Sequence, residues 1–158
     1  AWLCGGGSGR ERRVVVMGWV WGWCNGPGKG RRGRLGPSVH HIEGLDPGER
    51  AAGYNLARVL AQTAGYEGFG FPPLEAMACG TPVVVSDRAS LPELVGDAAV
   101  IAAADDPDAW RKALEKVVGD SDLTADLKRR GFLGAAQFSW SRSAELTWRS
   151  IDRAVKSA

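Results

Sequence analysis

The feature that most constrains the fold is a run of β-branched apolar residues, Val83-Val84-Val85, flanked by Pro82 and Ser86. A continuous apolar run of this kind is typical of a strand buried on both faces of a parallel sheet. Parallel neighbours are joined by crossover connections, usually helices, and helical patterns both precede and follow the run. The sequence therefore predicts an α/β fold, with a parallel sheet and flanking helices.

The alternation of strand and helix patterns extends from residue 37 to the end of the chain. Asp46, Pro47 and Glu49 have the spacing of a capping box with proline in the first helical turn. The segment before them is β-like and closes at Gly44. We predict strands at 39–43, 59–61, 82–86 and 98–102, and helices at 46–58, 72–79, 92–95, 106–118, 123–138 and 141–155.

Composition places the chain among ordinary globular domains. It has 158 residues, of which 44% are hydrophobic and 24% charged, enough for one domain with a core. No apolar run approaches the ~18–20 residues of a membrane span, and the amino end lacks the pattern of a signal peptide. The three cysteines form no C-x-x-C pair. We expect a soluble protein in a reducing, cytoplasmic compartment.

The net charge near zero is the sum of two segments whose charges have opposite sign. Residues 1–36 hold 11 of the 22 glycines and four of the seven tryptophans, with seven basic residues and one acidic, a net charge of +6. The remainder has 13 basic and 17 acidic residues, a net charge of −4. Short strands are predicted near residues 2–4 and 14–16. We otherwise predict that 1–36 is an atypical Gly/Arg/Trp-rich segment, disordered or read out of frame, and that 37–158 is the folded domain.

The loop Tyr66-Glu-Gly-Phe-Gly-Phe71 is the best candidate for a binding site. It should leave a strand at its carboxyl end, where open α/β sheets bind ligands. Gly68 and Gly70 permit close backbone approach, and the helix start at Pro72 is expected to supply free N–H groups for a phosphate or diphosphate. Carboxylates at Glu67 and Glu75 are good acceptors for paired sugar hydroxyls. The simpler alternative is that these acids only complement the helix dipole.

Two runs resemble a known family: YEGFGFPPLEAMACGTPVVVSD at 66–87 and SLPELVGDAA at 90–99. They resemble the donor-binding half of retaining GT-B glycosyltransferases of glycosyltransferase family 4, and are closest to bacterial mannosyl-transferring members. Phe138-Ser-Trp140, followed by an amphipathic helix, resembles the end of such proteins. The resemblance implies a Rossmann-like sheet forming the second half of a GT-B fold, over about residues 35–156.

The resemblance also implies roles for individual residues. Glu67 would be the catalytic carboxylate that contacts hydroxyls of the transferred sugar, and Glu75 would contact the ribose. Leu74 would pack near the nucleotide, and the backbone at Gly68, Phe69 and Gly70 would approach the sugar and diphosphate. The implied reaction moves a hexose, such as mannose, to a hydroxyl acceptor with retention. The donor is a nucleoside-diphosphate sugar, and no cofactor or metal is expected.

The chain departs from the family pattern in several places. Gln62-Thr63-Ala64 stands where the family usually has proline, and no strand pattern places Lys29, Arg31 or Arg32 as the expected diphosphate clamp. No acceptor-binding domain is recognisable, so we expect this chain alone to be inactive. The alternatives are a non-catalytic nucleotide-sugar-binding module, an inactive fragment, or a nucleotide-sugar isomerase. A glycan, a lipid-linked sugar or a small molecule would be the acceptor, with peripheral membrane contact through the missing domain.

Other motifs carry less information. Gly28-Lys29-Gly30 lacks the Ser/Thr of a phosphate-binding loop. Adjacent His40 and His41 on a strand should face opposite sides, which disfavours a shared metal. Cys79 is expected to be packed rather than reactive. The arginines at 31, 32 and 34 are expected to be solvated, with no nucleic-acid partner. Three acids are expected to cap and charge a helix start: Asp105, Asp106 and Asp108.

Overall fold

The computed structural model describes residues 2–6, 12–17, 39–42 and 44–157. In these ranges the strands are β1 (Trp2–Gly6), β2 (Arg12–Met17), β3 (Val39–Ile42), β4 (Ala57–Gln62), β5 (Val83–Ser86) and β6 (Val100–Ala102). The helices are α2 (Pro47–Leu56), α3 (Phe71–Ala78), α4 (Leu91–Val95), α5 (Pro107–Gly119), α6 (Ser121–Ala135) and α7 (Trp140–Lys156).

These strands form one sheet in the order β3-β2-β1-β4-β5-β6. β4, β5 and β6 are parallel, as predicted, and β2 is parallel to β3. β1 runs antiparallel to both of its neighbours, β2 and β4. Only residues 7–11 separate β1 from β2, and a connection that short suits antiparallel strands, because a parallel pair needs a crossover of a dozen or more residues.

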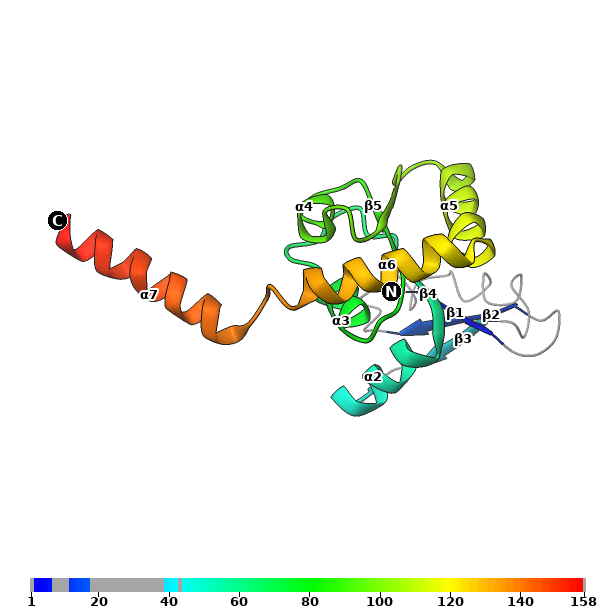
Figure 1. Ribbon diagram of the computed structural model, residues 1–158, viewed down its shortest axis with the longest axis horizontal. Helices are drawn as coiled ribbons and strands as arrows, with labels where there is room; N and C mark the ends of the chain where they lie inside the picture. Colours follow the sequence, from blue (N-terminus) through cyan, green and yellow to red (C-terminus); the bar gives the residue numbers. More distant parts are fainter. Residues whose placement is uncertain (1, 7–11, 18–38, 43, 158) are drawn as a thin grey trace, which may run out of the picture.

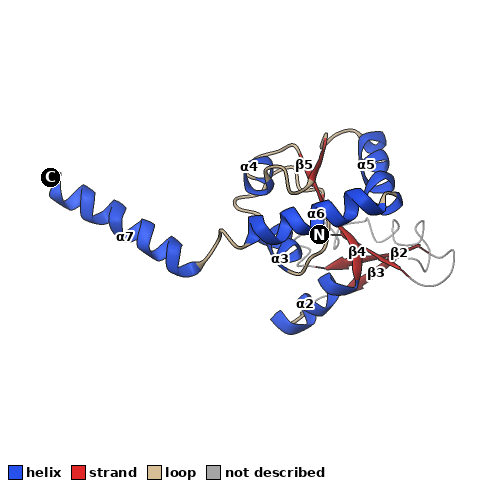
Figure 2. Cartoon of the chain, in the orientation of Figure 1, coloured by secondary structure: helices blue, strands red, loops and turns tan. Residues whose placement is uncertain are grey.

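The core is divided between the two faces of the sheet. Leu60, Val83 and Val85 point to one face and pack with residues of α2, α3 and α4. Val59 and Val84 point to the other face and pack with Trp110 and other residues of α5 and α6. This alternation along β4 and β5 explains why the valine run is apolar throughout: every one of its side chains is buried. Figure 2 shows the helices placed around the strands.

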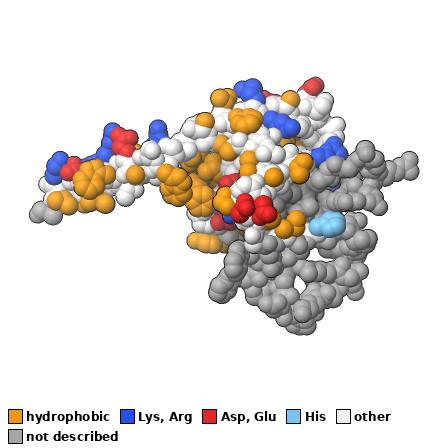
Figure 3. All heavy atoms as spheres, turned by 90° about the horizontal axis from the view of Figure 1, so that it is seen from below, with side chains coloured by type: hydrophobic (Ala, Val, Ile, Leu, Met, Phe, Trp, Pro, Cys, Tyr) orange, Lys and Arg blue, Asp and Glu red, His pale blue; other side chains and the backbone are white. Residues whose placement is uncertain are grey.

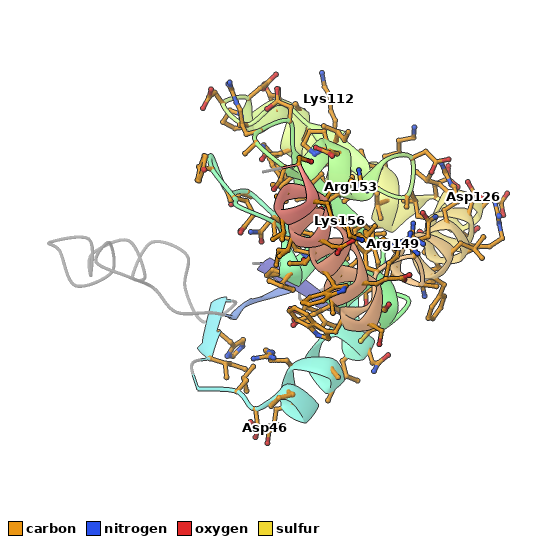
Figure 4. All side chains as sticks on the ribbon, turned by 90° about the vertical axis from the view of Figure 1, so that its left-hand side faces the viewer. Asp46, Lys112, Asp126, Arg149, Arg153 and Lys156 are labelled. Atoms are coloured by element: carbon orange, nitrogen blue, oxygen red, sulfur yellow. The ribbon has the colours of Figure 1, made fainter. Side chains whose placement is uncertain are left out.

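Helix starts follow the predicted capping signals. Asp46 accepts a hydrogen bond from the backbone N–H of Glu49, whose carboxylate accepts one from the N–H of Asp46, which completes the capping box. Asp46 lies at the foot of α2 in Figure 4. Asp106 caps α5 through the N–H groups of Asp108 and Ala109. Asp105 instead pairs with Arg88 at 2.7 Å.

Several predicted boundaries are wrong, among them the start of β6, which is Val100 rather than residue 98, and the start of α6, which is Ser121 rather than residue 123. We predicted a helix to residue 58, but α2 ends at Leu56 and β4 begins at Ala57, because Ala57 pairs with Gly5 of β1. We predicted a helix to residue 138, but α6 ends at Ala135. Tight i→i−3 hydrogen bonds take over there, since the N–H of Phe138 donates to the carbonyl of Ala135 at 3.1 Å.

The last helix, α7, extends away from the rest of the molecule (Figure 1). None of its residues is buried, although it is clearly amphipathic. Trp148 and Val155 are about 70% exposed on one side. Figure 3 shows hydrophobic side chains gathered where α7 leaves the body and again along the helix. Within the described ranges, no helix combines the length and apolarity needed to cross a bilayer.

Candidate functional site

The predicted loop follows β4 at the carboxyl end of the parallel strands, as expected for a ligand site in an α/β sheet. It runs from residue 63 to Gly70 and leads directly into α3. The Ser86 hydroxyl, at the end of the neighbouring strand β5, donates to the carbonyl of Ala64 at 2.7 Å. The sheet therefore holds the beginning of the loop.

The middle of the loop is held by Ser90, which precedes α4. Its hydroxyl lies 2.8 Å from the carbonyl oxygen of Glu67 and 3.0 Å from that of Phe69. In a trans peptide the carbonyl and the following N–H point in opposite directions. The N–H groups of Gly68 and Gly70 are therefore directed away from Ser90.

Gly70 ends the loop in a conformation that favours glycine. Its φ is +105°, and a Cβ atom there would lie 2.7 Å from Cδ2 of Leu94 and 3.0 Å from Cδ2 of Leu91. Gly68 differs, because a Cβ atom at that position would meet nothing within 4 Å. Gly70 is required by the protein itself, whereas the space beside Gly68 is open to a ligand.

The start of α3 offers fewer donors than we predicted. The helix begins at Phe71, and its second and third residues are Pro72 and Pro73, which have no N–H. The expectation of free N–H groups from Pro72 onward is therefore wrong. In the part of the chain that is described, no hydrogen bond engages the backbone N–H of residues 68–71. The available donors lie in the loop and at the first helical residue.

Glu67 and Glu75 have different surroundings. Glu67 Oε2 accepts a 3.1 Å hydrogen bond from Nε2 of Gln62. Glu75 Oε2 accepts a 2.9 Å hydrogen bond from the hydroxyl of Tyr54 on α2, and Oε1 lies 3.7 Å from Nη2 of Arg50. The side chain of Glu75 is 38% exposed, so this carboxylate remains accessible to a ligand.

Two pKa values are shifted beside Glu75. Burial raises the pKa of the Tyr54 hydroxyl well above its usual range, and the negative charge and hydrogen bond of Glu75 raise it further. Burial and the charge of Glu75 also raise the pKa of Cys79. Cys79 is half-buried against the core, so its predicted packing role is confirmed. Tyr54 remains a neutral donor to Glu75.

A groove of about 550 Å³ runs along α3 beside Glu75. Its walls are mainly aromatic: Phe71 stacks on Trp140 with ring centres 6.1 Å apart, and Phe69 meets Phe138 edge-on at 5.9 Å. Leu74 also lines it. The groove thus brings together three of the predicted site residues, Phe69, Leu74 and Glu75, whereas Glu67, Gly68 and Gly70 are outside its lining.

Sequence reasoning missed the residues that support the loop. Each of them holds a predicted site residue: Gln62 from the end of β4, Ser90 from the residue before α4, and Tyr54 from α2. Proximity to the motif could have drawn attention only to Gln62. The predicted basic residues Lys29, Arg31, Arg32 and Arg34, and the Gly28–Gly30 motif, lie outside the described residues. His40 is exposed on β3, and the described ranges hold no cluster of three metal-ligating side chains.

The parallel strands β4, β5 and β6, with helices packed on both faces of the sheet, define the class as a Rossmann-like α/β domain. Residues 32–133 match the family described as glycosyl transferases group 1. Because this match covers well over half of the chain, the protein belongs to the glycosyl transferases group 1 family. The predicted Rossmann-like fold and GT-B resemblance are thereby confirmed.

Individual relatives agree with this assignment. The chain is 43% identical over 94 residues to O-antigen chain mannosyltransferase B of Escherichia coli. The aligned region covers 60% of this chain and 25% of that protein. The chain therefore spans about a quarter of the length of that relative. Sucrose-phosphate synthase from Thermosynechococcus elongatus is 25% identical with a TM-score of 0.72, over 84% of this chain and 34% of that one.

A third likeness concerns the fold alone. The Anabaena protein Alr3699/HepE, solved in complex with UDP, superposes with a TM-score of 0.75 at 19% identity. The superposition covers 88% of this chain and 40% of that chain.

Proposed function

We propose that this chain binds the nucleoside-diphosphate sugar donor of a hexosyltransferase. The single observation that carries the proposal lies at residues 67–71: the carbonyl groups of Glu67 and Phe69 accept hydrogen bonds from Ser90, while the N–H groups of residues 68–71 have no partner among the described residues. Consecutive free N–H groups beside a helix amino end suit a diphosphate. The likeness to a fold solved with UDP supports the same ligand class.

The roles proposed for the carboxylates are those that the family resemblance implies, and their surroundings are compatible with them. Glu75 is proposed to contact the ribose; Tyr54 and Arg50 hold it at the groove and leave it accessible. Glu67 is proposed to contact hydroxyls of the transferred sugar from the loop that precedes α3. A carboxylate accepts hydrogen bonds at both oxygens and so suits neighbouring hydroxyl groups.

In the whole protein, we propose that a hexose passes from the donor to a hydroxyl acceptor with retention of configuration. The likeness to an Escherichia coli mannosyltransferase favours mannose as that hexose. The free N–H groups of the loop would stabilise the charge that develops on the leaving diphosphate. Glu67 would orient the sugar and support positive charge on its ring, with no cofactor required.

Calorimetry on the purified chain tests donor binding. GDP, UDP, GDP-mannose and UDP-glucose are titrated into the wild type, Glu75→Gln and a control, Glu115→Gln, on the exposed side of α5. We expect either GDP and GDP-mannose or UDP and UDP-glucose to bind the wild type and the control with equal affinity. The same ligands should bind Glu75→Gln about tenfold more weakly, which corresponds to the loss of one charge-assisted hydrogen bond. No binding to the wild type would contradict the proposal and favour an inactive fragment.

A further inference from the structure

Gln62 is a polar residue in an apolar environment. It ends β4, is only 6% exposed, and lies on the same sheet face as Leu60, which belongs to the core beneath α2, α3 and α4. Its Nε2 donates to Glu67 Oε2 at 3.1 Å. Its Oε1 is buried and has no hydrogen-bond partner among the described residues.

The orientation of this amide follows from its partner. A carboxylate only accepts hydrogen bonds, so the NH₂ group of Gln62 must face Glu67, which leaves the carbonyl oxygen unpaired in the interior. A buried acceptor without a partner destabilises the folded state. An apolar side chain of similar size would avoid that loss, so Gln62 is not the most stabilising residue for this position.

Gln62 restricts the position of the Glu67 carboxylate through its hydrogen bond. Ser90 fixes the backbone at Glu67, and the Gln62 amide fixes one of its two carboxylate oxygens. In the part of the chain that is described, no other hydrogen bond or ion pair reaches that carboxylate, so Oε1 of Glu67 stays available.

We propose that Gln62 is a positioning residue for Glu67, and that it thereby sets how tightly the sugar of the donor is held. The proposal rests on the proposed function, in which Glu67 contacts sugar hydroxyls. It assigns Gln62 an effect on the sugar alone, because Gln62 does not contact the free N–H groups that would bind the diphosphate.

The test measures the contribution of the sugar separately from that of the nucleotide. For each protein, calorimetry gives the ratio of the Kd of the nucleoside diphosphate to that of its sugar, using GDP with GDP-mannose and UDP with UDP-glucose. Gln62→Met should lower this ratio about tenfold, toward its value in Glu67→Ala, with the diphosphate Kd within about twofold of wild type. Gln137→Met, at an exposed glutamine, should change neither value.

A second variant, Gln62→Glu, should make the ratio of the two Kd values depend on pH, which a change in packing alone would not do. In Gln62→Glu the new carboxyl group can donate to Glu67 only while it holds a proton, and two ionised carboxylates so close repel each other. The ratio should therefore be near the wild-type value at about pH 5 and fall as the pH rises toward about 8. A ratio independent of pH in this variant would overturn the proposal.

Thermal unfolding distinguishes a positioning role of Gln62 from a structural one. Gln62→Met should unfold at a temperature equal to or above that of the wild type, because it removes the unpaired acceptor. A marked drop in that temperature would assign Gln62 a structural role and overturn the proposal, as would an unchanged ratio in a folded Gln62→Met. If the wild type binds nucleotides with no gain from the sugar, only the Gln62 proposal fails. If it binds no nucleotide, the proposed function fails with it.

Discussion

Two glycines of the loop before α3, Gly68 and Gly70, have different surroundings. Gly70 has a φ of +105° and no room for a Cβ atom, whereas Gly68 has open space. Gly70→Ala should lower the free energy of unfolding by about 1–3 kcal/mol, the usual cost of a residue forced into this backbone region. Gly68→Ala should change it by less than about 0.5 kcal/mol. Urea unfolding checks both, and equal losses in the two variants would contradict this account.

Tyr54 gives a prediction that depends on pH. Its pKa is raised in the folded state, first by burial and then by Glu75, so above about pH 10 the unfolded chain loses a proton that the folded protein keeps. Stability should therefore fall as the pH rises above that value. Tyr54→Phe should flatten this fall.

The matched control is Tyr66→Phe, which alters the only other tyrosine of the chain, a side chain that is 84% exposed. Thermal unfolding followed from pH 8 to about pH 11 would compare the three proteins. If Tyr54→Phe and wild type lose stability in parallel over this range, the burial assigned to Tyr54 is wrong.

At the candidate site, local residue spacing could be predicted from the sequence, whereas the side-chain contacts could not. The seven-residue spacing between Glu67 and Glu75 is visible in the sequence, and so is the glycine pattern between them. The partner of Glu75 is 21 residues away on another helix, and the hydroxyl that holds the loop is 23 residues from Glu67. Such contacts depend on how α2 and α4 pack, which no local pattern specifies.

At the scale of elements, α7 differs from every other described helix longer than one turn, because none of its residues is buried. Among the described residues, the ion pairs of this helix join its own side chains, Glu145 with Arg149 and Asp152 with Lys156. Arg149, Arg153 and Lys156 can be followed along it in Figure 4. Surface pairs of this spacing contribute only about 0.3–0.5 kcal/mol each.

We therefore expect that deleting residues 143–158 will leave the stability of the α/β body almost unchanged. The cut keeps Trp140, which stacks on Phe71. The free energy of unfolding should shift by less than about 1 kcal/mol, since an isolated helix of this length is only marginally stable. Urea unfolding measures the shift, and a loss of several kcal/mol would mean that α7 packs on the body in solution.

Element types were easier to predict than element ends. The capping box at Asp46 and the valine run of β5 are local signals: α2 begins directly after Asp46, and the valine run forms β5. β4 is longer than predicted because Ala57 pairs with β1, a strand more than fifty residues away. Boundaries set by such pairing depend on tertiary structure rather than on local preference.

In the whole molecule, the sheet positions the candidate site. Burial of β4 and β5 on both faces fixes their carboxyl ends, and the loop to α3 leaves from that edge. Alternating strands and helices predicted this much. The antiparallel direction of β1 was not predicted, because direction depends on which strand it joins rather than on its own residues.

We propose that the backbone N–H groups of residues 68–71, which have no partner among the described residues, bind the diphosphate of the donor. It can be tested directly by following backbone amide resonances of ¹⁵N-labelled chain during titration with GDP or UDP. The largest shifts should fall on Gly68, Phe69, Gly70 and Phe71, and the amides of α5 should not shift. Saturable shifts centred elsewhere, or no shifts with either nucleotide, would contradict it.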